Sequence, residues 1–463
     1  MRILFLSTYF RPDVASTGVI MTKLAEEFVA KGHEVTIVTS VPHYDPNQAW
    51  PEYSKKLVHT ERRDGMQIYR VRVCAADDRS SVAKRILAYG SFALLSAFRG
   101  ATLPKHDVIL VPSPPLSNGV IGDFLSRLRG TPFIYNVQDV WPDVAVRAGV
   151  LKNGRAIKRL KEMESYVYRR AAKISVISEG FRRNLLAKGV PDGKISVIPN
   201  FIDTEFVTPL PKQNYFSRKH ALENKFVVLF AGNMGFSQGL EIALNAAKLL
   251  EGNEEIKFLM VGNGAARNAA VNYCESAKLN NVEFLPFQAH EDVPAMYGAA
   301  DVCLIPLKRG FTMESVPCKL FTIMAAGKPA IAAVDHHSDT WELIQVARCG
   351  ICVEPENPRA LADTINRYYF DASARNESGR NARHYVERHF RPSSIAQGYL
   401  EMMEAAVALP SASAEPSRLV RQEIPESAAS KESGRVLGLR GPSSPGVASG
   451  GRSSAAANAA GRS

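Results

Sequence analysis

The chain is poor in the features that mark secreted, anchored or metal-binding proteins. It has six cysteines in 463 residues, at scattered positions that form no paired framework, which excludes a disulfide-stapled domain. Cys349 and Cys352 have the spacing of a redox or metal pair, but no second pair or histidine set accompanies them, so we interpret them as part of a buried strand. We predict no metal site.

Long hydrophobic runs are also missing. The longest apolar stretch, residues 86–103, is interrupted by Tyr89, Arg99 and several hydroxyl side chains, so it falls short of the roughly 18 apolar residues that cross a membrane. The apolar core of the first strand, residues 3–6, is shorter than the roughly 7–15 residues of a signal peptide core. These absences predict a protein of the reducing cytoplasm.

The positive charge is concentrated in the first half of the chain. Residues 1–200 carry 30 basic and 18 acidic side chains, whereas residues 201–385 carry 18 and 21. The excess therefore directs the first half toward an anionic partner, such as a membrane surface, a phosphorylated lipid or nucleic acid. Hydrophobic residues make up 46% of the chain and charged residues 22%, which is typical of a globular protein with two or three domains.

Short β-branched runs alternate with helix-length segments, which predicts an α/β protein with parallel sheets. The expected strands are 3–6, 35–39, 68–73, 108–111, 133–137, 174–177 and 195–198, then 226–230, 258–261, 282–285, 302–305, 330–333 and 351–353. A polar, proline-bearing stretch at 208–225 separates the two sets and reads as a connection between domains. We expect two doubly wound, Rossmann-like domains at 1–200 and 201–385.

The end of the chain differs from the rest. A helical pattern ends near residue 406, and we expect a C-terminal helix at 386–409 that packs back toward the N-terminal domain. Residues 410–463 contain no aromatic side chain and are dominated by Ser, Ala, Gly and Pro. Such a segment buries too little apolar surface to offset its conformational entropy, so we predict a disordered tail.

Loops that follow strands are where a doubly wound domain binds its ligands. The loop after the first strand leads through Gly18 into a helix expected at 19–30, and Gly18 lets a ligand or backbone approach that helix closely. Asp139 stands at the end of the fifth expected strand, where its carboxylate is suited to orienting a sugar hydroxyl. Asp143, four residues later, has capping of a helix as its simplest explanation.

Two glycine turns open the second half. Gly232, Asn233, Gly235 and Gln238 lie between a strand and a helix, where backbone amides can cradle a diphosphate. Gly262, Asn263 and Gly264 form a second turn, with Glu283 about 20 residues further on. This second turn leaves open an NAD-dependent enzyme, although Arg267 replaces the third glycine of a dinucleotide fingerprint.

The densest group of candidate residues runs from Glu314 to Pro329. Pro317 is suited to the first position of a helix, whose free amides and positive dipole end attract anions. Lys319 would then neutralise a phosphate, and Glu314 would accept hydrogen bonds from sugar hydroxyls. Each taken alone also fits a helix-terminal charge or a solvated lysine.

Together, these motifs resemble the bacterial glycosyltransferase family 4, in particular its polysaccharide and O-antigen branch of enzymes similar to colanic-acid and fucosamine transferases. The resemblance covers residues 1 to about 408. It rests on the first-strand loop and on Gly32-His33-Glu34-Val35, Asp139-Val140-Trp141-Pro142-Asp143, Gly232-Asn233-Met234-Gly235, Gln238-Gly239, Pro317-Cys318-Lys319 and Ala326-Gly327-Lys328-Pro329.

The resemblance implies a GT-B fold and a retaining, metal-independent glycosyltransferase that needs no cofactor, because the nucleotide sugar is a substrate. It places Asp139, Glu314 and Lys319 in catalysis. The implied donor-binding residues are Gly18, Gly232, Asn233, Gly235, Gln238, Gly262, Asn263, Pro317, Leu320 and Thr322. Thr322 stands where the family's second glutamate is usual, and Asn233 and Gln238 stand where the family commonly has an arginine and a lysine.

The resemblance also implies an acceptor, which we expect to be a glycan or a polyprenyl-diphosphate-linked sugar used in surface polysaccharide or lipopolysaccharide synthesis. Residues 83–95 and 155–161 combine basic and apolar side chains, as in helices that lie on a membrane. We therefore expect peripheral binding to the inner face of the cytoplasmic membrane. A soluble basic face over ordinary core helices is the alternative.

Other functions are compatible with parts of this pattern. A sugar-nucleotide epimerase can share the two-domain architecture without transferring a sugar, and the turn at Gly262 keeps the NAD-dependent enzyme open. A nucleic-acid-binding module rests on charge alone, and no aromatic and basic recognition motif supports it. We therefore expect no nucleic-acid partner.

Overall fold

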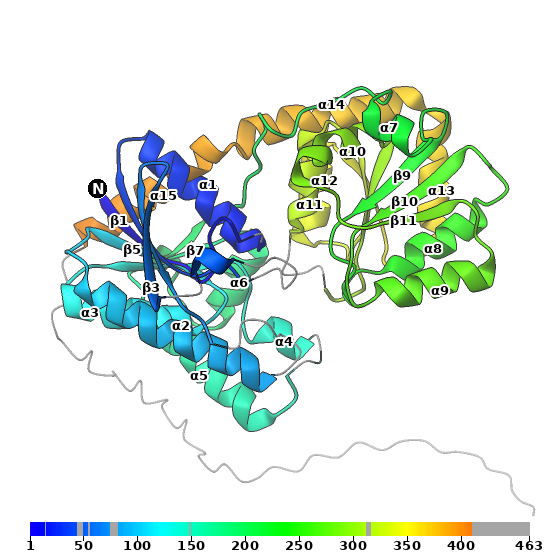
Figure 1. Ribbon diagram of the computed structural model, residues 1–463. Helices are drawn as coiled ribbons and strands as arrows, with labels where there is room; N and C mark the ends of the chain where they lie inside the picture. Colours follow the sequence, from blue (N-terminus) through cyan, green and yellow to red (C-terminus); the bar gives the residue numbers. More distant parts are fainter. Residues whose placement is uncertain are drawn as a thin grey trace, which may run out of the picture. The chain divides into compact units, whose positions relative to one another are not determined.

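The computed structural model describes residues 1–13, 15–43, 50–53, 56–74, 82–147, 149, 151–311 and 316–409. Glu314 and the tail expected at 410–463 lie outside the described residues. The described chain holds two sheets, each with helices on both faces (Figure 1). The predicted α/β architecture with two doubly wound halves is confirmed.

The first sheet has eight strands in the order β3-β4-β2-β1-β5-β6-β7-β8. Neighbouring strands run parallel except β3, which is antiparallel to β4. The strands are β1 (Arg2–Leu6), β2 (Glu34–Ser40), β3 (Val58–Arg63), β4 (Met66–Val71), β5 (Val108–Ser113), β6 (Phe133–Val137), β7 (Lys173–Val176) and β8 (Ile195–Val197). The strand order reverses between β1 and β5, so the loops after β1, β5 and β6 lie near the position where such sheets bind ligands.

Two layers of helices enclose this sheet because its central strands are apolar on both faces. Leu4 and Leu6 of β1 point into a core shared with α2, α3, α5 and α6, whereas Ile3 and Phe5 point into a core shared with α1 and α15. The helices of this half are α1 (Ser16–Ala30), α2 (Val82–Thr102), α3 (Ser117–Arg129), α4 (Asp143–Arg147), α5 (Gly154–Arg170) and α6 (Glu179–Ala187).

The second sheet has six parallel strands in the order β11-β10-β9-β12-β13-β14. They are β9 (Phe226–Ala231), β10 (Ile256–Val261), β11 (Val282–Leu285), β12 (Val302–Pro306), β13 (Ala330–Ala333) and β14 (Gly350–Val353). β9 is the strand at which the order reverses, with β10 on one side and β12 on the other. The loops that follow β9, β10 and β12 therefore share the edge at which a ligand is expected.

Helices also cover both faces of the second sheet. One core contains α8, α9 and α13, and the opposite core contains α7, α10, α11, α12 and α14. Their bounds are α7 (Tyr215–Lys219), α8 (Leu240–Leu249), α9 (Arg267–Ala277), α10 (Val293–Ala299), α11 (Cys318–Ala325), α12 (Asp339–Ala347), α13 (Pro358–Phe370) and α14 (Ala372–His389).

The last described helix, α15 (Pro392–Ala408), leaves the second half and lies beside α1 (Figure 1). Its side chains Tyr399 and Met403 are buried in the core formed by α1 and β1. The expected boundary at residue 385 falls inside α14, so it does not coincide with the end of a helix. Among the described residues, none of the helices combines the length and the apolar character needed to cross a bilayer.

Candidate functional site

The two glycine turns after β9 and β10 pack directly against each other. The backbone of Gly232, Gly262 and Gly264 has φ angles of 135°, 141° and 149°, which glycine alone adopts readily. A Cβ atom on Gly262 would lie 1.9 Å from the carbonyl oxygen of Gly232, and one on Gly264 would lie 2.6 Å from that of Met234. The amide of Met234 also donates to the carbonyl of Asn263 at 2.8 Å. Gly262 and Gly264 are therefore needed to seat one loop on the other.

Lys319 points from α11 toward the first of these turns. Its ammonium nitrogen lies 2.6 Å from Oε1 of Gln238 and 4.2 Å from the centre of the Phe230 ring. Burial of this group lowers its pKa to about 7, because desolvation disfavours the charged form. Gly232 adjoins the Lys319 side chain: an added Cβ would lie 3.6 Å from the ammonium nitrogen. Lys319, Gln238 and the Gly232 turn thus lie together at one edge of the sheet.

The start of α11 differs in detail from the expectation. Pro317 is the N-cap residue of α11, one position before the expected first helical position. Its backbone is extended, with φ −61° and ψ 126°. Leu320 is completely buried in the core, and its amide donates to the carbonyl of Pro317 at 2.9 Å. Its side chain is thus packed in the core and its amide is already bonded, and its place among the donor-binding residues stays a prediction. Thr322 is half-buried one turn after Lys319 on the same helix.

Asp139 stands two residues after the end of β6. Its side chain is reachable by solvent, yet surrounding protein atoms desolvate the carboxylate and raise its pKa to about 6. Its charge further raises the pKa of the Cys318 thiol, which burial raises first. Asp139 therefore lies close enough to the start of α11 for the two to interact electrostatically. Asp143, by contrast, is the first residue of α4 and pairs with Lys188 at 2.7 Å.

A chain of buried amides connects β6 to α11. Gln138 donates to Oδ1 of Asn136 at 2.9 Å and accepts from Nδ2 of Asn200 at 2.9 Å. Asn136 also donates to the hydroxyl of Tyr399 at 2.8 Å, and Asn200 donates to the sulfur of Cys318 at 3.8 Å. The chain holds the residues just before Asp139 and ties them to the first turn of α11, which carries Lys319. The sequence analysis did not find Asn136 or Asn200, because the partners of these amides are distant in sequence.

Gly18 is not in the loop before the first helix, as expected, but in the first turn of α1, which begins three residues earlier than predicted. A Cβ atom on Gly18 would lie 3.1 Å from Cβ of Tyr9 and 3.2 Å from its carbonyl carbon. The group that approaches Gly18 is therefore the chain's own loop after β1.

Three further observations concern the dinucleotide candidate Glu283, metal ligands and exposed aromatic side chains. Glu283, the candidate ribose ligand of a dinucleotide site, pairs with Lys257 at 3.4 Å. Within the described ranges, we find no group of three or more His, Cys, Asp or Glu side chains that could hold a metal ion. Two exposed aromatic side chains, Phe236 after β9 and Phe287 after β11, were missed by the sequence analysis. An exposed aromatic residue just beyond a buried strand is the signal that could have found them.

Family models match both halves of the chain. The model described as glycosyl transferases group 1 matches residues 212–385, and the model described as a glycosyl transferase 4-like domain matches residues 17–200. WcaI of Escherichia coli, described as a colanic acid biosynthesis glycosyl transferase, is 25% identical over 411 residues, which is 86% of this chain and 99% of WcaI.

Solved structures agree on the fold. Sucrose-phosphate synthase from Thermosynechococcus elongatus superposes with a TM-score of 0.67 at 20% identity, covering 88% of this chain and all of that one. HepE of Anabaena, solved with UDP and glucose, superposes with a TM-score of 0.66 at 17% identity over the same shares. The resemblance found in the sequence is thereby confirmed. The chain belongs to the bacterial glycosyltransferases of the GT-B fold, with a glycosyl transferase 4-like domain followed by a group 1 domain.

Proposed function

We propose that this glycosyltransferase moves a sugar from a nucleotide-sugar donor to a glycan or polyprenyl-diphosphate-linked acceptor in surface polysaccharide biosynthesis, with retention of configuration and without a metal ion. The observation that carries the proposal is the position of Lys319, a desolvated cation at the start of a helix and against a glycine turn. WcaI, through its description, supports the polysaccharide pathway, and HepE, solved with UDP, supports a nucleotide donor.

The leaving diphosphate would occupy the space between Lys319 and the Gly232 turn. Lys319 has no carboxylate within ion-pair distance among the residues that the structure describes, and its bond to Gln238 leaves two N–H donors of the ammonium group. The positive end of α11 adds to the attraction. Cations and dipoles that are already in place stabilise a departing diphosphate with little reorganisation.

The sugar and the nucleoside would be held by residues on either side of Lys319. The family resemblance assigns the donor sugar to Glu314, which lies outside the described residues, and leaves Thr322 with a single hydroxyl for the ribose. Phe287, which is 59% exposed just after β11, offers a face on which the nucleobase can stack. Loss of nucleotide affinity in a Phe287→Ala variant would support this placement.

The proposed transfer takes place on one face of the donor sugar. The bond between the anomeric carbon and the diphosphate oxygen breaks, the acceptor oxygen bonds to the same carbon from the same side, and the acceptor proton passes to the departing diphosphate. Asp139 would orient an acceptor or donor hydroxyl. With a pKa of about 6 it is mostly ionised at neutral pH, so it can accept a hydrogen bond.

An apolar face on the first half suits a lipid-linked acceptor. Leu87, Leu94 and Phe98 of α2 are exposed, and so are Phe124 and Leu128 of the neighbouring helix α3. In each helix their spacing places them on one side. The exposed cations Lys158, Arg159 and Lys161 lie on α5, which contacts α3. We propose that this face binds the anionic inner leaflet of the membrane, with apolar side chains in the interface and basic ones against lipid phosphates.

The first experiment is thermal unfolding of the full chain with UDP, GDP, dTDP, CMP, ADP or NAD at equal concentration. A ligand that binds the native state raises the midpoint of unfolding, so a selective shift with one nucleoside diphosphate is expected. The sugar nucleotides of that base are then supplied with lipid extracts, and the anomeric configuration of the product is determined by NMR. A shift with NAD alone, or an inverted product, would contradict the proposal.

A further inference from the structure

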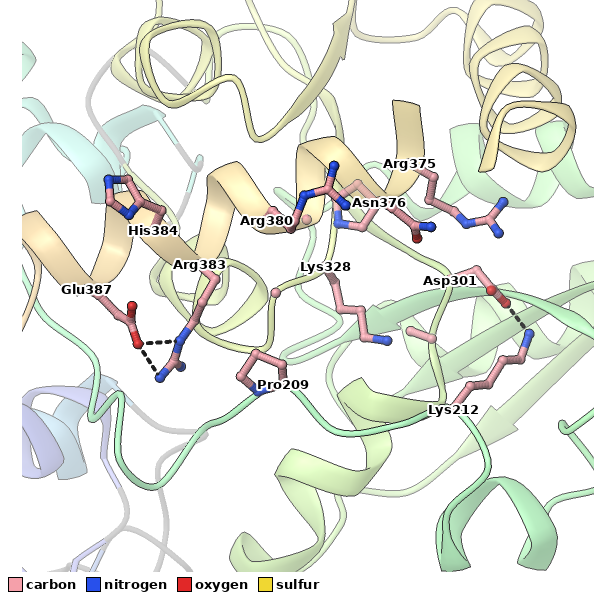
Figure 2. A pocket seen from close by; sticks show the side chains of 14 residues that line it. Pro209, Lys212, Asp301, Lys328, Arg375, Asn376, Arg380, Arg383, His384 and Glu387 are labelled. Atoms are coloured by element: carbon pink, nitrogen blue, oxygen red, sulfur yellow. Dashed lines mark hydrogen bonds and ion pairs between the residues drawn. The ribbon is translucent and has the colours of Figure 1, made fainter. Parts of the chain in front are cut away.

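A pocket in the second half of the chain lies away from the proposed donor site. It has a volume of about 560 Å³ and lies between α14 and the segments that precede β12 and β13 (Figure 2). Asp301 and Lys328, which line it, stand just before the amino ends of these strands. Gly232 and Lys319 lie at the opposite, carboxyl edge of the same sheet, so a ligand in this pocket would not occupy the donor site.

Two glycines set the width of the pocket. A Cβ atom on Gly379 of α14 would lie 2.3 Å from the carbonyl oxygen of Gly327, so helix and turn approach each other backbone to backbone. Gly327 has a φ of +66°, in the left-handed region that glycine tolerates. The contact fixes Lys328, the next residue, beneath α14. The pocket is therefore a defined part of the fold.

The lining is strongly basic. It includes five cations, Lys212, Lys328, Arg375, Arg380 and Arg383, but only two carboxylates. Figure 2 shows how both carboxylates are used: Asp301 pairs with Lys212, and Glu387 pairs with Arg383. Arg383 also donates to three backbone carbonyls, of Thr204, Val207 and Ala325. These pairs hold the walls of the pocket and leave no carboxylate in the lining for the remaining three cations.

The three remaining cations have few acceptors. Lys328 donates to the carbonyl of Gly298 at 2.9 Å, and Arg375 donates to that of Tyr368 at 2.6 Å. Within the described ranges, no carboxylate lies within ion-pair distance of Lys328, Arg375 or Arg380. Burial lowers the pKa of Lys328; the charges of Cys303 and Asp301 oppose this shift, and those of Lys212 and Arg375 add to it. A bound anion would relieve this repulsion.

We propose that this pocket binds a small phosphate-bearing anion, with Lys328, Arg375 and Arg380 as its cationic ligands. Its volume is within the range of about 300–1,000 Å³ typical of small-ligand sites. Guanidinium groups match the oxygens of a phosphate in pairs, and a lysine supplies a further point charge. The lining has no aromatic ring other than His384 for a nucleobase to stack on, which favours pyrophosphate or a sugar phosphate over a nucleotide.

The test is calorimetric titration of the full chain with inorganic pyrophosphate, carried out in a Lys319→Ala background so that the proposed donor site does not contribute. Arg380→Gln and Lys328→Gln should each weaken binding at least about fivefold, since each removes a charge-assisted hydrogen bond. Arg388→Gln makes the same change on α14 outside the lining and should leave the affinity within about twofold. Arg380 is exposed, so its variant is expected to fold normally.

A parallel measurement separates a soluble ligand from a lipid headgroup. The same variants are sedimented with vesicles that contain phosphatidate. If only pyrophosphate binding depends on Arg380 and Lys328, the ligand is a soluble phosphate compound, and if only vesicle binding does, it is a lipid phosphate. If neither depends on them, or if Arg388→Gln has the same effect as Arg380→Gln, the proposal is wrong.

Discussion

The ammonium nitrogen of Lys319 lies 2.6 Å from the amide oxygen of Gln238, across the edge of the sheet at which the glycine turns lie. A neutral amide rather than a carboxylate is its partner, so the lysine is held in place without being neutralised. Burial lowers the pKa of this ammonium group to about 7. A diphosphate would supply the missing negative charge, which makes the protonation of Lys319 a direct reporter of donor binding.

The affinity for a nucleoside diphosphate should therefore fall with rising pH. Above about pH 7 free Lys319 loses its proton, whereas the bound phosphate raises the pKa, so binding takes up a proton. Affinity should drop by up to about tenfold per pH unit between 7.5 and the pKa in the complex. This range lies above the phosphate's own titration near pH 6. Calorimetry in buffers of different ionisation enthalpy measures the proton uptake.

Lys319→Arg is the matched control for this experiment, because a guanidinium stays charged throughout the range. Its binding should show little pH dependence and no proton uptake above pH 7.5. In Lys319→Ala, turnover should fall at least tenfold, or about 1.4 kcal/mol of barrier. Full activity in the alanine variant would remove Lys319 from the mechanism.

Asp139→Asn should stabilise the protein at neutral pH while lowering its activity. The folded pKa of about 6 lies above the ordinary 3.8, so ionised Asp139 destabilises the folded state above pH 6, and this penalty disappears below about pH 4. The variant should unfold at a higher temperature than the wild type at pH 7.5 and at the same temperature near pH 3.5. Equal midpoints at pH 7.5 would show that the carboxylate is not desolvated.

Gly262→Ala should destabilise the chain by at least about 2 kcal/mol, because the new Cβ combines an unfavourable φ with an overlap at the Gly232 carbonyl. Denaturant unfolding measures the loss. Gly154→Ala is the control: this glycine begins α5 and has no neighbouring atom near the added Cβ. It should stabilise by about 0.4–1 kcal/mol. A neutral Gly262 variant would mean that the two loops are not seated as described.

Leu94→Gln and Phe98→Gln should each reduce binding to anionic vesicles about tenfold, since each removes an apolar side chain worth about 1.5–3 kcal/mol when buried. Both are highly exposed, at 72% and 68%, so the folded state should keep its stability. Phe370→Gln is the control, because Phe370 is 80% exposed at the end of α13, in the other half of the chain. It tests whether loss of any exposed aromatic side chain weakens vesicle binding. Equal losses from all three variants would argue against a specific membrane face.

The sequence analysis predicted every strand that is rich in apolar side chains, but it missed β3. β3 is polar and half-exposed, and it pairs only with β4 at the edge of the sheet, so no apolar run marks it. Its one signal was the pair Asp64 and Gly65, both with positive φ in the turn to β4, a combination typical of a tight hairpin.

For the candidate site, too, the sequence showed some features and only the structure showed others. Asp139 was singled out at the end of an expected strand and Lys319 at the start of an expected helix. In parallel sheets both kinds of position lie at the carboxyl edge of the sheet. The sequence shows that Leu320 is adjacent to Lys319, but only the structure shows that its side chain is completely buried, because successive helical residues face different sides. The sequence predicts a donor contact at Gly262, and the structure adds that a side chain there would overlap the carbonyl oxygen of Gly232.

The sequence by itself determined the fold class, the alternation of strands and helices, the family and the positions of the charged candidates, because these follow from local periodicity and short motifs. Only the tertiary structure decided which groups meet. The pairing of Lys319 with Gln238, the amide chain from Tyr399 to Cys318 and the basic pocket beneath α14 each bring together residues from distant parts of the sequence. Their proximity depends on how strands and helices pack, which no local pattern encodes.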